Sequence, residues 1–102
     1  MELAEAQARR AVTQLRAEGW AVGAPATGDG WRKAVRREAR RNGLRVRTGI
    51  ADVGGVERPW AATAEMYQAM HAALGGFTLD AFGAAVVRAA VNREEENYSP
   101  KM

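Results

Sequence analysis

Cysteine is absent from this chain of 102 residues, and serine and histidine each occur once. Without cysteine there is neither a disulfide nor a thiolate metal site, which is typical of proteins in a reducing compartment. The single histidine, His71, has no carboxylate at ligand spacing, so we expect a surface residue, no metal site and no cofactor. The single serine, Ser99, lies in the C-terminal tail, away from any positioned base. The sequence therefore predicts that the protein is not an enzyme.

Large apolar residues are also scarce. Leucine, isoleucine, valine and phenylalanine together supply 17 residues, whereas alanine alone supplies 22. A core made mostly of methyl groups buries little area per residue. Because the net charge is only +3, this scarcity indicates a thin core rather than disorder. In a small chain, such a thin core favours additional stabilisation by a partner subunit or a ligand.

Long apolar segments are missing as well. No run of 18 apolar residues occurs, so no transmembrane helix and no membrane partner are expected. Acidic and basic residues interrupt the first ten positions, so the sequence predicts no signal peptide. We expect a cytoplasmic protein.

Positive charge is concentrated in one stretch. Residues 29–47 contain eight basic side chains against only Asp29 and Glu38, a local net charge of +6. The overall charge of +3 does not reveal this local positive charge, which favours polyanionic partners. The eight basic residues are Arg32, Lys33, Arg36, Arg37, Arg40, Arg41, Arg45 and Arg47.

Hydrophobic spacing and cap residues predict a single α+β domain over residues 1–102, mainly helical, with four helices and one or two short strands. The expected helices are residues 2–18, 30–42, 63–74 and 79–95, and the expected strands are 20–22 and 44–50. Asp29, Thr63 and Thr78 are the predicted N-caps. Residues 52–59 are predicted as a glycine-bearing loop, with a short extended piece at 56–60. We expect a frayed tail over residues 97–102, because three glutamates precede it at the C-terminal end of a helix.

The basic helix and the strand after it are the strongest functional signal. Arginines spaced four apart line the flanks of a helix, and their planar guanidinium groups suit phosphate or guanine. In the strand, Leu44, Val46, Thr48 and Ile50 alternate with Arg45 and Arg47, so both arginines are expected on one outward face, as in a β-ribbon that enters a DNA groove. Two plainer interpretations stay open: a solvated helix face, and an edge strand protected by charge.

The C-terminal helices suggest a family. Residues 63–93 resemble the helix pair of ribbon-helix-helix (Arc/MetJ-like) DNA-binding proteins, through Glu65-Met66-Tyr67, Gly76, Thr78-Leu79-Asp80-Ala81-Phe82 and Val86-Val87-Arg88. The resemblance implies a homodimer through residues 63–95, with Met66, Met70, Leu79, Phe82, Val86 and Val87 at the interface. It also implies a phosphate at the helix N-terminus near Thr78. Whether strand 44–50 or segment 56–60 is the ribbon is left open.

Together these features predict a small DNA-binding protein: a repressor, partition or accessory factor of a bacterial chromosome, plasmid or phage. Its basic half, residues 1–50, would contact the phosphates of double-stranded DNA, with Arg45 and Arg47 as candidates for base edges. Its helix pair would form the association half. The alternative is an adaptor or inhibitor that docks an acidic protein partner through the basic helix.

Overall fold

The computed structural model describes the backbone of residues 2–98 and the side-chain surroundings of residues 5–97. Along this part of the chain, four helices and three strands follow one another: α1 (Glu2–Glu18), β1 (Trp20–Val22), α2 (Gly28–Arg41), β2 (Val46–Val53), β3 (Val56–Thr63), α3 (Ala64–Leu74) and α4 (Leu79–Tyr98). The predicted α+β class is confirmed, and the predicted count of one or two strands is wrong by one.

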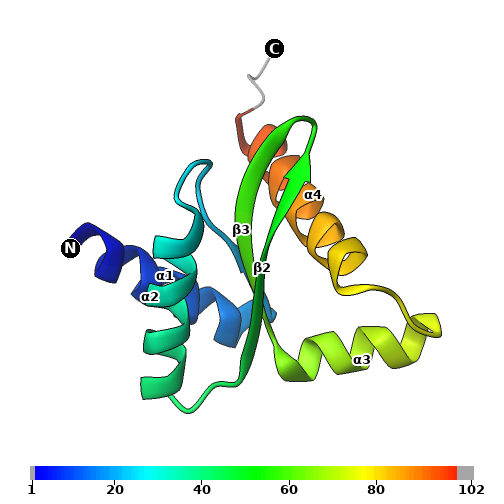
Figure 1. The fold of residues 1–102 in the computed structure, drawn as a ribbon, viewed down its shortest axis with the longest axis horizontal. Coiled ribbons are helices and arrows are strands. Elements are labelled where there is room, and N and C mark those ends of the chain that lie inside the picture. Colours follow the sequence, from blue (N-terminus) through cyan, green and yellow to red (C-terminus); the bar gives the residue numbers. More distant parts are fainter. Residues whose placement is uncertain (1, 99–102) are drawn as a thin grey trace.

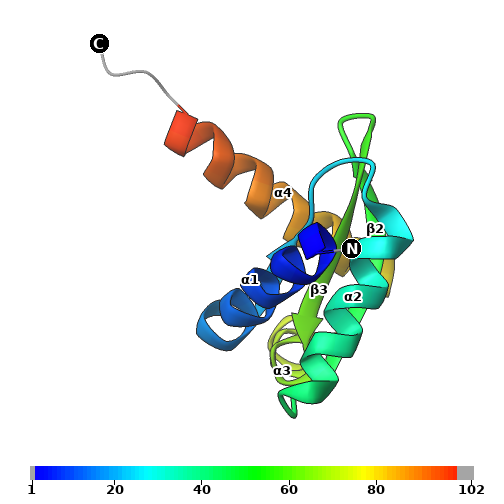
Figure 2. The ribbon, with the colours of Figure 1, turned by 90° about the vertical axis from the view of Figure 1, so that its left-hand side faces the viewer.

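An antiparallel sheet in the order β1-β3-β2 divides the helices into two layers. Helices α1 and α2 pack on one face, and α4 crosses the other, with α3 extending from the end of β3 (Figure 1). The perpendicular view places α1 and α2 together in front of the sheet (Figure 2). Side chains alternate along β3, so Ala61 faces α1 and α2, whereas Trp60 and Ala62 face α4.

The thin core is therefore two small clusters on opposite faces of the sheet. The first joins alanines of α1 and the sheet to Leu15, Trp31 and Val35. The second surrounds Trp60 with Phe82, Val86 and Val87. Alanine and glycine keep the helices close to the sheet, which explains how few large apolar residues suffice.

The third strand, β3, contains the short extended piece predicted at 56–60 and replaces most of the loop that the sequence predicted over residues 52–59. Gly54 and Gly55 have φ angles of 65° and 83°, as a two-residue type I′ hairpin requires. The hairpin pairs Val53 with Val56 and extends to Val46 opposite Thr63, so β2 covers 46–53 rather than 44–50. Because β1 and β2 pair with opposite edges of β3 over residues 60–62, the part of β3 next to α3 has no free edge for a twofold mate. The ribbon-helix-helix arrangement is not confirmed.

Local cap signals were mostly correct. The Thr63 hydroxyl accepts a hydrogen bond from the Met66 amide at 3.1 Å, and that of Thr78 accepts one from Ala81 at 3.1 Å. Asp29 is not an N-cap: α2 begins earlier, after Thr27, and Asp29 lies in its first turn. There the carboxylate pairs with Arg32 at 3.0 Å instead of closing the helix end.

Helix α4 continues farther than predicted, through Asn97 and Tyr98, and the rest of the predicted tail, residues 99–102, lies outside the described residues. Contacts near its end explain the extra length. Arg93 pairs with Glu18 at 2.8 Å and lies 4.9 Å from the centre of the Trp20 ring. Glu94 pairs with Arg58 of β3 at 2.8 Å. These pairs offset the unfavourable position of glutamates at a helix C-terminus.

Candidate nucleic-acid interface

Helix α2 presents basic side chains on every side that its core face leaves free. Trp31, Val35 and Ala39, four residues apart, are its buried face. The remaining surface has two stripes with the same spacing: Arg32, Arg36 and Arg40 on the flank toward β2, and Lys33, Arg37 and Arg41 on the outer side. Six of the eight predicted binding residues thus lie on one helix, about 21 Å long at 1.5 Å per residue.

The flank toward β2 is held in place by Thr48. Its hydroxyl accepts hydrogen bonds from Nη1 of Arg36 at 2.9 Å and from Nε of Arg32 at 3.3 Å. These bonds cross from the helix to the strand and restrict two otherwise flexible side chains. Restricting them before a ligand arrives lowers the entropy that binding must overcome.

Few of these charges are neutralised within the protein. Arg32 pairs with Asp29 at 3.0 Å, and Arg41 pairs with Glu38 at 3.6 Å. Among the residues that the structure describes, no carboxylate lies within 4.0 Å of the remaining four cations of α2, which are Lys33, Arg36, Arg37 and Arg40. These four like charges therefore repel one another without compensation from a neighbouring carboxylate.

Arg45 joins this surface, whereas Arg47 does not. Arg45 precedes β2 and lines a hollow of about 380 Å³ together with Arg36 and Arg40. Arg47 lies within β2, opposite Ala62, and its guanidinium stands 4.6 Å from the centre of the Tyr67 ring of α3. Both side chains are exposed, and both lie beside α3, since Arg45 also lines a second hollow with residues of that helix. Only Arg45 adjoins the arginines of α2 as well.

Thr78 also lies away from the arginines. It precedes α4, on the opposite side of the sheet from α2, and its hydroxyl is engaged as the helix cap (Figure 1). A phosphate at Thr78 would therefore not share a ligand surface with α2.

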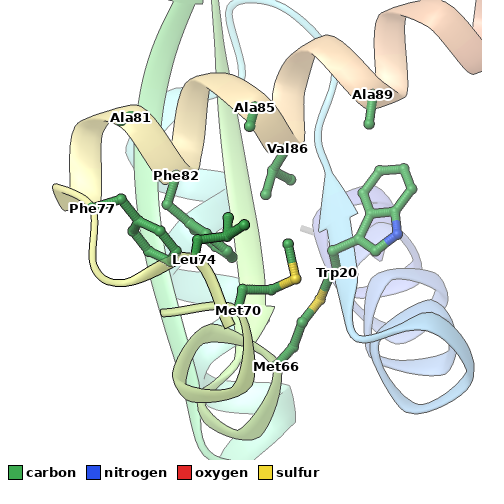
Figure 3. Close-up of a pocket in the computed structure, with 10 residues that line it drawn as sticks. All are labelled: Trp20, Met66, Met70, Leu74, Phe77, Ala81, Phe82, Ala85, Val86 and Ala89. Atoms are coloured by element: carbon green, nitrogen blue, oxygen red, sulfur yellow. The ribbon is translucent and has the colours of Figure 1, made fainter. Parts of the chain in front are cut away.

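An apolar groove separates α3 from α4 on that opposite side (Figure 3). Its volume is about 390 Å³, and it is lined by Trp20, Met66, Met70, Leu74, Phe77, Ala81, Phe82, Ala85, Val86 and Ala89. Helix α3 has no buried residue, and Met70 and Leu74 are 38% and 64% exposed. His71 is on the surface, as expected, and lies against the Phe77 ring at 5.0 Å between centres. The groove is an apolar surface without a partner in the described chain.

Only some of the predicted dimer residues line this groove. Met66, Met70, Phe82 and Val86 line it, and Leu79 is exposed nearby. Val87 is fully buried in the core beneath α4, so it is not accessible to a second chain without opening that core.

The ion pair between the buried Arg58 and the exposed Glu94 is a feature that no sequence pattern indicated. Arg58 is 8% exposed and donates two hydrogen bonds to the Glu94 carboxylate, at 2.9 and 2.8 Å, and a third to the Gly23 carbonyl oxygen at 2.9 Å. Arg58 lies beside a proline in a segment predicted only as a short extended piece, and nothing in the sequence indicates its partner 36 positions away. The pair joins β3 to the far part of α4.

Hydrogen bonds from Arg58 lower the pKa of Glu94 below its ordinary value of 4.5. The ionised carboxylate therefore stabilises the folded protein above that value, and this contribution is lost as the pH falls through the folded-state pKa. We expect Glu94→Gln to be less stable than the unchanged protein at neutral pH, with the difference narrowing as the solution is acidified from about pH 5 to 3. Urea unfolding followed by circular dichroism across this range measures the difference. Parallel stability curves would contradict the assignment.

No group of three or more metal-ligating side chains occurs among the described residues. Within the same part of the chain, no single helix has the length and hydropathy needed to cross a membrane. Helices α3 and α4 have the required length and hydropathy only when they are counted together, and a bend of 107° separates them. No protein-family model matches the chain, and comparison with curated proteins and with solved structures gave no match.

Proposed function

We propose that this protein binds double-stranded DNA, with α2 as the contacting element. One observation supports this proposal most: four cations of α2 have no carboxylate partner in the described chain and lie outside the buried face of that helix. An α-helix fits the major groove, where phosphates line both walls. Two basic stripes on one helix suit that arrangement, because each can face one strand of the duplex.

The contacts of α2 are suited to phosphates, so they position the protein rather than select a sequence. Arg45 belongs with these phosphate contacts, because it lines a hollow together with Arg36 and Arg40, whereas Arg47 is engaged with Tyr67. A role as a repressor, partition or accessory factor in a bacterial chromosome, plasmid or phage is consistent with such a surface.

Fluorescence anisotropy with a labelled 20-base-pair duplex tests the proposal at two salt concentrations. Four phosphate contacts predict a slope of about −3.6 in log K against log salt, so affinity should fall about 150-fold between 50 and 200 mM salt. The absence of binding at 50 mM salt would contradict the proposal. That outcome would favour the alternative, an adaptor that docks an acidic protein through the same helix.

We also infer that the apolar groove is covered by a second copy of the chain. Met66, Met70 and Leu74 follow one another at helical spacing along α3, so α3 can act both as a wall of its own groove and as the apolar helix that fills its partner's. A twofold axis would bury both surfaces at once. We expect light scattering to give twice the chain mass of 11.0 kDa at micromolar concentration. The Leu74→Glu variant should have the mass of a single chain, 11.0 kDa. A folded monomer of the unsubstituted protein at micromolar concentration would exclude the dimer.

A further inference from the structure

Three arginines of the basic surface converge where α2 turns into β2. Arg36 and Arg40 are four residues apart on the helix, and Arg45 returns to them after the turn at Asn42 and Gly43. The hollow between them, of about 380 Å³, is completed by Gly43, Leu44 and Val46. The turn between α2 and β2 lies at the lower end of α2 in Figure 1.

Backbone hydrogen bonds fix the turn that forms this hollow. The Leu44 amide donates to the Ala39 carbonyl oxygen at 2.9 Å, and the Gly43 amide donates to that of Arg40 at 3.1 Å. Gly43 has a φ of 71°, a conformation that favours glycine. On the other side, the carbonyl oxygen of Arg45 accepts from the Ala64 amide at 2.8 Å, which ties the turn to the start of α3. The three arginines therefore project from a constrained frame.

The charges around the hollow are all of one sign. No carboxylate lines it, and Arg36, Arg40 and Arg45 form no ion pair among the described residues. Two carboxylates lie close by. Glu38 is engaged by Arg41 and by the Asn42 amide, and Glu65 lines a separate hollow on the other side of Arg45. An anion in the hollow would meet three guanidinium groups, whose planar N–H donors suit phosphate oxygens.

We propose that this hollow is an anion site that holds one phosphate group between Arg36, Arg40 and Arg45. The proposal rests on the DNA-binding function and deepens it, because it names one fixed phosphate contact among the many of α2. Guanidinium groups bind phosphate oxygens in a bidentate manner, and Arg36 is already positioned by its bond to Thr48. A bound backbone phosphate would fix the register of α2 on the duplex.

Inorganic phosphate is the probe for the site. Titration of phosphate against chloride, at constant ionic strength, should shift the amide resonances of Gly43 and Leu44 in a saturable manner. Arg45→Gln and Arg40→Gln should each weaken the apparent affinity about tenfold or more, as expected for a lost hydrogen bond between charged groups. Arg88→Gln, which makes the same charge change on α4, outside the hollow and outside α2, should leave the phosphate titration unaltered. Chemical shifts elsewhere verify that each variant is folded.

Measuring duplex DNA binding with the same proteins separates this proposal from the broader one. Saturable phosphate binding that depends on Arg45, together with DNA binding that is weaker in Arg45→Gln than in Arg88→Gln, supports both proposals. A linear response to phosphate that is equal in all variants shows ionic screening only and overturns the anion site, even where DNA still binds. Saturable phosphate binding without DNA binding would retain the hollow as a site for free phosphate and overturn its role on the duplex.

Discussion

Replacing Lys33, Arg37 and Arg40 by alanine is expected to weaken binding of duplex DNA at 50 mM salt by about 100-fold or more. These side chains have no ion-pair partner in the described chain, so their whole charge is available to phosphates. Losing three phosphate contacts should also reduce the magnitude of the salt slope by about 2.7. Anisotropy at several salt concentrations measures both quantities.

A matched control separates the position of the charges from their number. Arg9 and Arg10 of α1 and Arg88 of α4 are exposed and form no ion pair among the described residues. Replacing these three arginines by alanine changes the net charge by the same amount as the triple substitution in α2. We expect this control to retain most of the affinity and the slope. Equal losses in both triple variants would show that net charge, and not α2, attracts DNA, and would contradict the proposed interface.

The loss of affinity should not reflect unfolding of α2. Alanine is the best helix former, and the three replaced side chains lie outside the buried stripe of Trp31, Val35 and Ala39. Removing like charges from one helix also relieves repulsion. The far-ultraviolet circular dichroism spectrum and the melting temperature of the variant should therefore equal or exceed those of the unchanged protein.

Features determined by neighbouring residues were predictable from the sequence. The buried stripe of α2 follows from spacing alone, and the caps at Thr63 and Thr78 follow from a hydroxyl that meets an amide three positions later. The basic character of α2 needs nothing beyond the sequence. Its partial neutralisation by Asp29 and Glu38 is also local, because both pairs are three residues apart.

Features determined by tertiary contacts were not predictable. Strand β3 is covered on both faces, so it lacks the alternation of a half-buried strand, and Pro59 and Arg58 argued against a strand. Arg58 is accommodated only because Glu94 reaches it from α4. Likewise, the separation of Arg45 from Arg47 depends on where β2 begins and on what covers each face. The local signals of β3 in the sequence were the extended piece predicted at 56–60 and the glycine pair before it, which is typical of a hairpin turn.

Trp60→Ala is expected to cost about 3–5 kcal/mol of stability, a large part of the 5–15 kcal/mol typical of a small domain. Trp60 is 2% exposed, contacts Phe82 edge-on at 5.5 Å between ring centres, and lies between Gly49 of β2 and Gly83 of α4. With so few large apolar residues, no neighbour can fill the space. Trp20→Ala makes the same chemical change at a half-buried position and should cost clearly less. Urea unfolding compares the two, and equal losses would contradict the central role of Trp60.

A second substitution tests the same packing from the opposite side. A Cβ atom at Gly83 would overlap the indole nitrogen of Trp60, so Gly83→Ala should destabilise the unchanged protein by about 1–3 kcal/mol through overpacking. In the Trp60→Ala background the indole is gone, and alanine is the better residue within a helix by about 1 kcal/mol. The same substitution should therefore become stabilising there. A change of sign between the two backgrounds requires direct contact between Trp60 and Gly83, because independent sites would give the same effect in both. An unchanged sign would place the indole elsewhere in the folded protein.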